Sequence, residues 1–232
     1  MPSLRSLYRS STAGLDAQVL LLSFTSLVVM LGSSIVSPVL PLYAREFGVS
    51  YAAAGMLVAA FAIGRLAFDY VGGALADRVS LRLLATIGAL VSALSAFLCA
   101  RATSFNWLVS YRVIEGLGSA FYVIPIMALF ARSVPPERMG QAMSFYQSMI
   151  LLGVSFGPTF GGIVAEQLSS LRAPFYLMAL FDLAVAAGTW RWVASGVRPA
   201  SEAVPERPPI GRVIRHVRSR SFFYVLLLTF LV

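Results

Sequence analysis

Two charged side chains, one helical turn apart, lie inside a long apolar stretch of this sequence. Arg112 and Glu115 belong to residues 107–130, and their spacing places them on one face of a helix. Asp69 and Asp182 also lie within apolar stretches. Charges at such positions are costly to bury without a partner or a water-filled cavity, so each of these residues is a candidate functional residue, and Glu115 and Asp182 are candidates to bind a proton. Two alternatives stay open: Arg112 and Glu115 as a self-neutralising structural pair, and Asp182 as a protonated hydrogen-bonding group.

The stretches that must position these side chains are long enough to span a membrane. Of the 232 residues, 58% are hydrophobic, and the mean hydropathy is +0.80. These values exceed those of ordinary soluble domains. A helix needs roughly 20 largely apolar residues to cross the hydrocarbon core, and six stretches qualify. They are Val19–Tyr43, Ala52–Leu75, Leu83–Ala100, Trp107–Phe130, Ala142–Ala165 and Ala173–Ala194. The sequence therefore predicts an all-α membrane protein built as a six-transmembrane-helix bundle.

The composition changes after the sixth stretch. Residues 1–194 contain the predicted bundle, and residues 195–221, rich in Pro, Glu and Arg, are predicted to be a cytoplasmic basic linker. Residues 222–232 are apolar again. They are too few to cross the hydrocarbon core as a helix, so we expect a truncated start of a seventh transmembrane helix. The alternative is a complete six-span protein with a short apolar tail.

The net charge of +8 is distributed by topology and does not form one basic face. Every basic residue is an arginine, and thirteen of the eighteen fall in alternate connections, at 5–9, 78–82, 132–138 and 191–220. By the positive-inside rule these segments and the amino terminus are cytoplasmic. We therefore expect a multi-pass protein of the cell (inner or plasma) membrane with the lipid bilayer as its partner, and no nucleic acid. With one cysteine and one histidine, the sequence indicates no metal site and no cofactor.

Glycines form a stripe along the fifth stretch. Gly153, Gly157 and Gly161 recur every four residues, so that another backbone can approach that side of the helix closely. Pro158 and Gly162 complete this segment. We therefore expect a close contact between helices along this stripe.

The second stretch repeats part of this pattern. Gly64, Gly72 and Gly73 have the spacing of the glycines in the fifth stretch, with a common offset of 89 residues. This repetition favours two equivalent three-helix units. Because the following turn is short, the second and third stretches are predicted to form an antiparallel hairpin, with Gly73 permitting close packing against another helix. Pro38 and Pro41 are predicted to bend the first stretch.

Three motifs resemble those of the major facilitator superfamily of secondary transporters. The first lies between the second and third stretches and follows the pattern G-x-L-a-D-r-x-G-r-k; its matching residues are Gly73, Leu75, Asp77, Arg78 and Arg82. The second is R-x-x-q-G, with Glu115 at the usual amide position. The third, g-x-x-x-G-P-x-x-G-G, matches at Gly153, Gly157, Pro158, Gly161 and Gly162. This third motif resembles that of proton-coupled antiporters, especially drug exporters. Ser80 and Leu81 depart from the first motif, which puts its full charge network in doubt.

The resemblance implies the amino-terminal half of a twelve-helix fold that works by alternating access around a site near the bilayer midplane. It implies that Asp77 and Arg132 help to latch the cytoplasmic side, and that Arg112 and Glu115 tune proton exchange. It also implies that the glycine stripe of the fifth span packs against a helix of a second bundle. The missing carboxyl-terminal half would then be a partner of this chain. If the protein is proton-coupled, Glu115, Asp182 or Asp69 carries the proton, or the carrier lies in that half.

The leading hypothesis is proton-coupled efflux of small, largely apolar compounds, with protons and a small-molecule substrate as further partners. The proposed substrate cavity draws on Met30, Ser34, Tyr122, Met127 and Tyr146, although such side chains at helical spacing also serve as plain packing. An uptake transporter for a metabolite or sugar is the main alternative and should have more polar cavity residues. A non-transporting membrane sensor is less favoured, because it would need no charges within the membrane. An enzyme is not indicated, since no nucleophile–base pair is apparent.

Overall fold

The computed structural model describes residues 17–76 and 78–193, and within them the chain is helical, without β-strands. Six of its helical segments are long and apolar enough to cross a membrane. The six-helix prediction is therefore confirmed. The predicted linker at 195–221 and the seventh stretch at 222–232 lie outside the described residues.

The first span is divided into two helices. Helix α2 covers Ala17–Ile35 and helix α3 covers Leu40–Arg45, with a turn at residues 36–39 between them. Pro38 lies in that turn, and Pro41 lies in the first turn of α3, where its missing N–H has no cost. The predicted bend is therefore present, and it changes the direction of the chain near one end of the span.

The other spans are long helices joined by short connections. They are α4 (Tyr51–Ala76), α5 (Leu81–Ala100), α6 (Phe105–Ser133), α7 (Met139–Gln167) and α8 (Ala173–Trp192), with the 3₁₀ turn η1 (Pro136–Arg138) before α7. Ser80 and Ser104 cap the amino termini of α5 and α6, since their side-chain oxygens accept backbone N–H groups of Leu83 and Trp107. Pro125 and Pro158 lie inside α6 and α7, which continue past them. Such interior prolines are tolerated in membrane helices.

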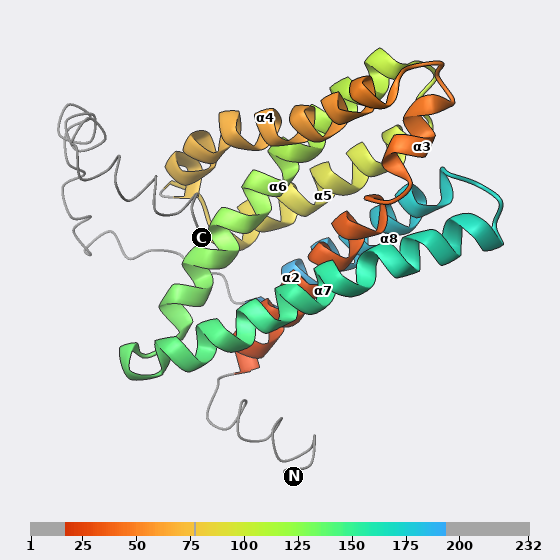
Figure 1. Cartoon of the computed structure of the whole chain (residues 1–232). Coiled ribbons are helices and arrows are strands. Elements are labelled where there is room, and N and C mark those ends of the chain that lie inside the picture. Colours follow the sequence, from red (N-terminus) through yellow and green to blue (C-terminus); the bar gives the residue numbers. More distant parts are fainter. Residues whose placement is uncertain (1–16, 77, 194–232) are drawn as a thin grey trace, which may run out of the picture. The chain divides into compact units, whose positions relative to one another are not determined.

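Helices that follow each other in the chain are not always the helices that pack together. Helix α6 packs along both α4 and α5, while α2 packs along α7 and α8, and α5 along α8 (Figure 1). Helices α4 and α5 barely touch, so the predicted hairpin of the second and third spans is not a packed pair. Gly73 has open space where a Cβ would lie, so its predicted role in close packing is also wrong.

Glycines bring two of these helix pairs into backbone contact. A Cβ added at Gly64 of α4 would collide with the Val113 carbonyl of α6, and one added at Gly153 of α7 would collide with the backbone of α2. In each case the second helix of one three-helix unit meets the first helix of the other. The structure thus supports the equivalence of the second and fifth spans that their glycine spacing predicts.

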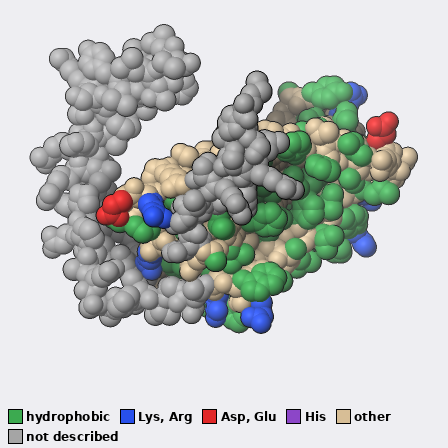
Figure 2. Space-filling view, turned by 90° about the horizontal axis from the view of Figure 1, so that it is seen from below, with side chains coloured by type: hydrophobic (Ala, Val, Ile, Leu, Met, Phe, Trp, Pro, Cys, Tyr) green, Lys and Arg blue, Asp and Glu red, His purple; other side chains and the backbone are tan. Residues whose placement is uncertain are grey.

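The surface of the described bundle has the distribution expected for a membrane protein. Large apolar side chains are exposed along the helices, including Leu66 at 72% and Leu94 at 58% exposure. Figure 2 shows a broad hydrophobic area, with the visible acidic side chains toward the two ends of the described part. Lipid can solvate such an apolar surface, so its exposure needs no soluble partner.

Candidate functional site

Arg112 and Glu115 of α6 form a closed ion pair in the interior of the bundle. Nη1 of Arg112 lies 2.6 Å from Oε1 of Glu115, and Nε donates to the Leu57 carbonyl of α4 at 3.4 Å. The guanidinium also lies 5.0 Å from the ring centroid of Phe61. Arg112 is 7% exposed and Glu115 is 1% exposed. A buried charge pair of this kind needs such additional contacts to offset the cost of removing both groups from water.

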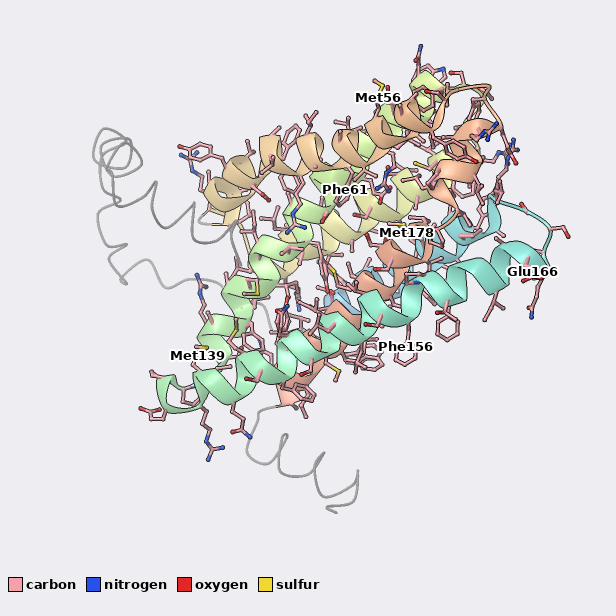
Figure 3. All side chains as sticks on the ribbon, in the orientation of Figure 1. Met56, Phe61, Met139, Phe156, Glu166 and Met178 are labelled. Atoms are coloured by element: carbon pink, nitrogen blue, oxygen red, sulfur yellow. The ribbon has the colours of Figure 1, made fainter. Side chains whose placement is uncertain are left out.

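A cavity of about 90 Å³ lies beside this pair. Helices α2, α4, α5, α6 and α8 all contribute to its wall. Phe61 and Met178, labelled in Figure 3, come from α4 and α8. The complete lining is Val29, Met30, Ser33, Phe61, Arg65, Ala89, Ser92, Glu115, Ser119, Tyr122, Met178 and Asp182.

Three buried polar atoms of this cavity have no hydrogen-bond partner in the described part of the chain. They are Oε2 of Glu115, the hydroxyl of Tyr122 and Oδ2 of Asp182. All three side chains are at most 2% exposed. Buried polar groups are normally hydrogen-bonded, so three without partners around one cavity indicate a place where a ligand, water or proton is accommodated.

Several predicted residues meet at this cavity and others do not. Met30, Tyr122, Glu115 and Asp182 line it, and Arg112 acts on it through its pair with Glu115. Asp69 is absent from the lining, so the structure does not place it among the proton-coupling groups of this cavity.

Three predicted cavity residues have packing positions instead. Ser34 contacts the glycine stripe of α7, since a Cβ added at Gly157 would meet its side chain. Met127 and Tyr146 belong to the hydrophobic core, and the Tyr146 hydroxyl accepts a hydrogen bond from Ser26 at 3.2 Å. None of these three residues lines this cavity, and their place in a substrate cavity stays a prediction.

Arg65 is the main cavity residue that sequence reasoning missed. It lies in the second apolar stretch, so the argument that identified Arg112 also applied to it. Phe61 and Met178 gave no such signal, because aromatic and Met side chains are common throughout the spans. The sequence also gave no sign that three serines line the cavity, because serine is frequent in packed membrane helices. They are Ser33, Ser92 and Ser119.

A comparison with known families decides the broader assignment. The family model described as "Major Facilitator Superfamily" matches residues 22–232. The chain belongs to the major facilitator superfamily. Its six membrane-capable helices agree with the fold that its three motifs indicated.

Individual relatives agree with membership of the superfamily. The chain is 32% identical to the quinolone resistance protein NorA of Staphylococcus aureus over 162 residues, which are 70% of this chain and 41% of NorA. It is 25% identical to the uncharacterized MFS-type transporter MJ1560 of Methanocaldococcus jannaschii, covering 74% of this chain and 44% of that protein. The chain thus spans less than half the length of these relatives.

A solved structure shows the same fold. The inward-facing, unoccupied bacterial homolog of the human lysosomal transporter Spinster aligns with a TM-score of 0.75 at 19% identity. The alignment covers 91% of this chain and 50% of that one. The six described spans therefore have the arrangement of helices found in a major facilitator transporter.

The motif between the second and third spans lies only partly within the described residues. Arg78 and Arg132 are exposed, and the guanidinium of Arg82 lies 5.0 Å from the ring centroid of Trp190 on α8. Asp77 and its predicted pairing with Arg132 lie outside the described residues. Leu75 is half-buried at the end of α4. Arg82 therefore contributes to the contact between α5 and α8, which sequence reasoning did not foresee.

The fifth-span motif packs within this six-helix bundle. Gly153, Gly157 and Gly161 are buried against α2, where added Cβ atoms would meet Leu27, Leu31 and Ile35. The prediction that this stripe contacts a second bundle is therefore wrong. Gly162, by contrast, has open space around it. The opposite face of α7 exposes a line of polar side chains at Ser144, Ser148, Ser155, Thr159 and Glu166.

Proposed function

We propose that this chain belongs to a secondary transporter that exports small compounds in exchange for protons by alternating access. The cavity supports this proposal, because an ion pair and three unpartnered buried polar atoms surround one space inside a bundle of spans. Ionisable groups within a membrane are costly and typically mark substrate or proton pathways. The similarity to NorA, named for quinolone resistance, favours efflux as the direction.

The lining of the cavity favours substrates that combine an apolar body with a polar or charged group. Met30, Phe61 and Met178 offer apolar and aromatic surface. Arg65 and Asp182 offer ionisable groups on the same wall, and a purely apolar compound would give these two groups no partner. The proposed substrates are therefore small amphipathic compounds, which narrows the largely apolar class expected from the sequence.

Uptake of a metabolite or sugar is the second candidate. Ser33, Ser92 and Ser119 favour it, because three hydroxyl groups around a small cavity suit a ligand rich in hydrogen-bonding groups. A competition assay separates the two candidates. Under this alternative, sugars or small metabolites displace a bound fluorescent amphipathic compound; under the efflux proposal they do not.

Alternating access requires a second body against which this bundle can move. We propose that the exposed polar line on α7 faces that body or a water-filled path, since lipid gives polar side chains no hydrogen-bonding partner. The carboxyl-terminal half expected from the relatives' length would supply this body. We further propose a plasma-membrane location with a cytoplasmic amino terminus, from the arginine distribution.

Transport by the full-length gene product in everted membrane vesicles tests the proposed function. An imposed proton gradient should drive accumulation of amphipathic test compounds, and a protonophore should abolish it. Vesicles containing Glu137→Gln protein serve as the control, because Glu137 lies exposed in the turn η1, outside the cavity. A folded protein that moves no member of a broad compound panel under this gradient would contradict the proposal.

A further inference from the structure

The two buried acids of the cavity differ in their partners. Glu115 is held by Arg112 through a contact of 2.6 Å, whereas no ion pair joins Asp182 to a basic residue in the described chain. Asp182 lies at the middle of α8, is 2% exposed and has an Oδ2 atom without a hydrogen-bond partner. A structural hydrogen-bonding role for Asp182 would require a partner that the described residues do not provide.

The charged and titratable groups that share the cavity with Asp182 come from α4 and α6. Helix α6 contributes Glu115 and Tyr122, and α4 contributes Arg65. Glu115 and Tyr122 both interact electrostatically with Asp182. Helices α2 and α5 contribute uncharged side chains to the lining, namely Val29, Met30, Ser33, Ala89 and Ser92. From α7, Tyr146 lies in the same core cluster as Val185 and Ala186 of α8, with its hydroxyl bound by Ser26.

These surroundings allow Asp182 two favourable states. A lone carboxylate beside the negative Glu115 is costly, because a buried charge needs a counter-charge. The neutral acid removes that cost, and so does a carboxylate paired with a cation that enters the cavity. Glu115 lacks this choice, since its nearest cation, Arg112, is part of the protein and is fixed by Leu57 and Phe61.

We infer that Asp182 is the acid that exchanges its proton for the cationic group of a transported compound, while Arg112 and Glu115 remain a fixed pair beside it. This assignment rests on the proposed function and names the coupling residue of the same site. When the ligand cation arrives, the O–H bond of neutral Asp182 breaks, the proton passes to water, and the carboxylate pairs with the cation. When the cation leaves, water on the other side of the membrane returns a proton. One positive charge replaces another at each step, so the cavity never holds an uncompensated carboxylate.

The rest of the wall suits the body of such a ligand. Phe61 already lies against one cation, the Arg112 guanidinium, which shows that its ring face is directed toward positive charge in this part of the bundle. Met30 and Met178 add flexible apolar surface from α2 and α8. An organic cation with its charge at Asp182 therefore finds apolar contacts on several sides.

Infrared titration of the purified full-length protein tests the assignment without any ligand. Between acidic and alkaline buffer, the wild-type difference spectrum should contain a band of a buried protonated carboxyl group that is lost as the pH rises. Asp182→Asn should remove this band, Asp182→Glu should restore it at a shifted position, and Glu137→Gln, at an exposed acid of η1, should leave it unchanged. Persistence of the wild-type band in Asp182→Asn would overturn the inference.

Proton release on ligand binding supplies a second readout, with tetraphenylphosphonium as the probe. In weakly buffered detergent solution, wild-type protein should release protons as the probe binds. Asp182→Asn, which lacks the carboxylate, should bind the probe more weakly and release no protons per bound probe. Asp182→Glu should recover the release. Equal release per bound probe in wild type and Asp182→Asn would overturn the assignment even if transport is confirmed. Failure of the wild-type protein to transport, with the carboxyl band still assigned to Asp182, would instead contradict the proposed function.

Discussion

The glycine contact between α7 and α2 makes a quantitative prediction for two neighbouring substitutions. In Gly153→Ala the new Cβ would lie 2.6 Å from the Leu27 carbonyl oxygen, which is 0.8 Å inside the 3.4 Å at which ordinary van der Waals contact begins. The obstacle is backbone, so no side chain can rotate away, and α7 must move from α2. Overpacking of this kind costs about 1–3 kcal/mol. In Gly162→Ala nothing lies within 4 Å of the new Cβ.

Both substitutions gain the same helix propensity, about 1 kcal/mol for alanine over glycine, so the difference between the two variants isolates the packing cost. We expect Gly153→Ala to be less stable than Gly162→Ala by about 1–3 kcal/mol. Unfolding of the full-length protein in mixed detergent micelles, followed by circular dichroism, measures this difference. Equal stabilities of the two variants would refute the contact between α7 and α2.

Two further predictions concern helices α4 and α6. On α4, Gly64→Ala should destabilise the protein and Gly73→Ala should not, because the first Cβ meets the backbone of α6 and the second meets open space. Equal unfolding midpoints of the two variants would contradict the close contact between α4 and α6. Within α6, Glu115→Leu should cost about 3–5 kcal/mol, because it leaves the Arg112 guanidinium buried without its carboxylate. The double variant Arg112→Met/Glu115→Leu should recover most of this loss in the same unfolding assay, and no recovery would show that the two residues act independently.

Much of the fold follows from the sequence, because a membrane imposes few choices on an apolar segment. Some signals can be recognised from a short piece of sequence, namely the long apolar stretches, the alternate arginines and the paired prolines. The bounds of the helices agree closely with those of the apolar stretches. The sequence did not predict as well which helices pack against each other. Gly153 and Gly73 are both glycines in a span, yet one is buried against a neighbouring backbone and the other has open space. Only the three-dimensional arrangement distinguishes them, since spacing gives the face of a helix and not what that face meets.

The candidate site, like the fold, was only partly predictable from the sequence. Charged residues inside apolar stretches are rare, so Arg112, Glu115 and Asp182 were identifiable from the sequence alone. The difference between the two acids followed only in part. The spacing predicted Arg112 beside Glu115, but only the structure shows that no basic residue of another described helix pairs with Asp182. Uncharged side chains such as Met127 and Met178 carried no distinguishing signal, and the structure places one in the core and the other on the cavity wall.

The glycine contacts also explain how a cavity with unpartnered polar atoms can persist. A gap between helices would normally close, because packed interiors have few voids and empty space forfeits contacts. Here α4 is held to α6, and α2 to α7, by backbone contacts that leave no side chain to rearrange. Both pairs contribute to the cavity wall. The pair α4 and α6 supplies Phe61 and Glu115, and the pair α2 and α7 supplies Met30 from α2. Under the exchange proposed for Asp182, the change of charge occurs on α8, beside α2. The cavity that contains this charge is bounded by two stiff pairs of helices, so we expect the exchange to favour movement of whole pairs over local collapse.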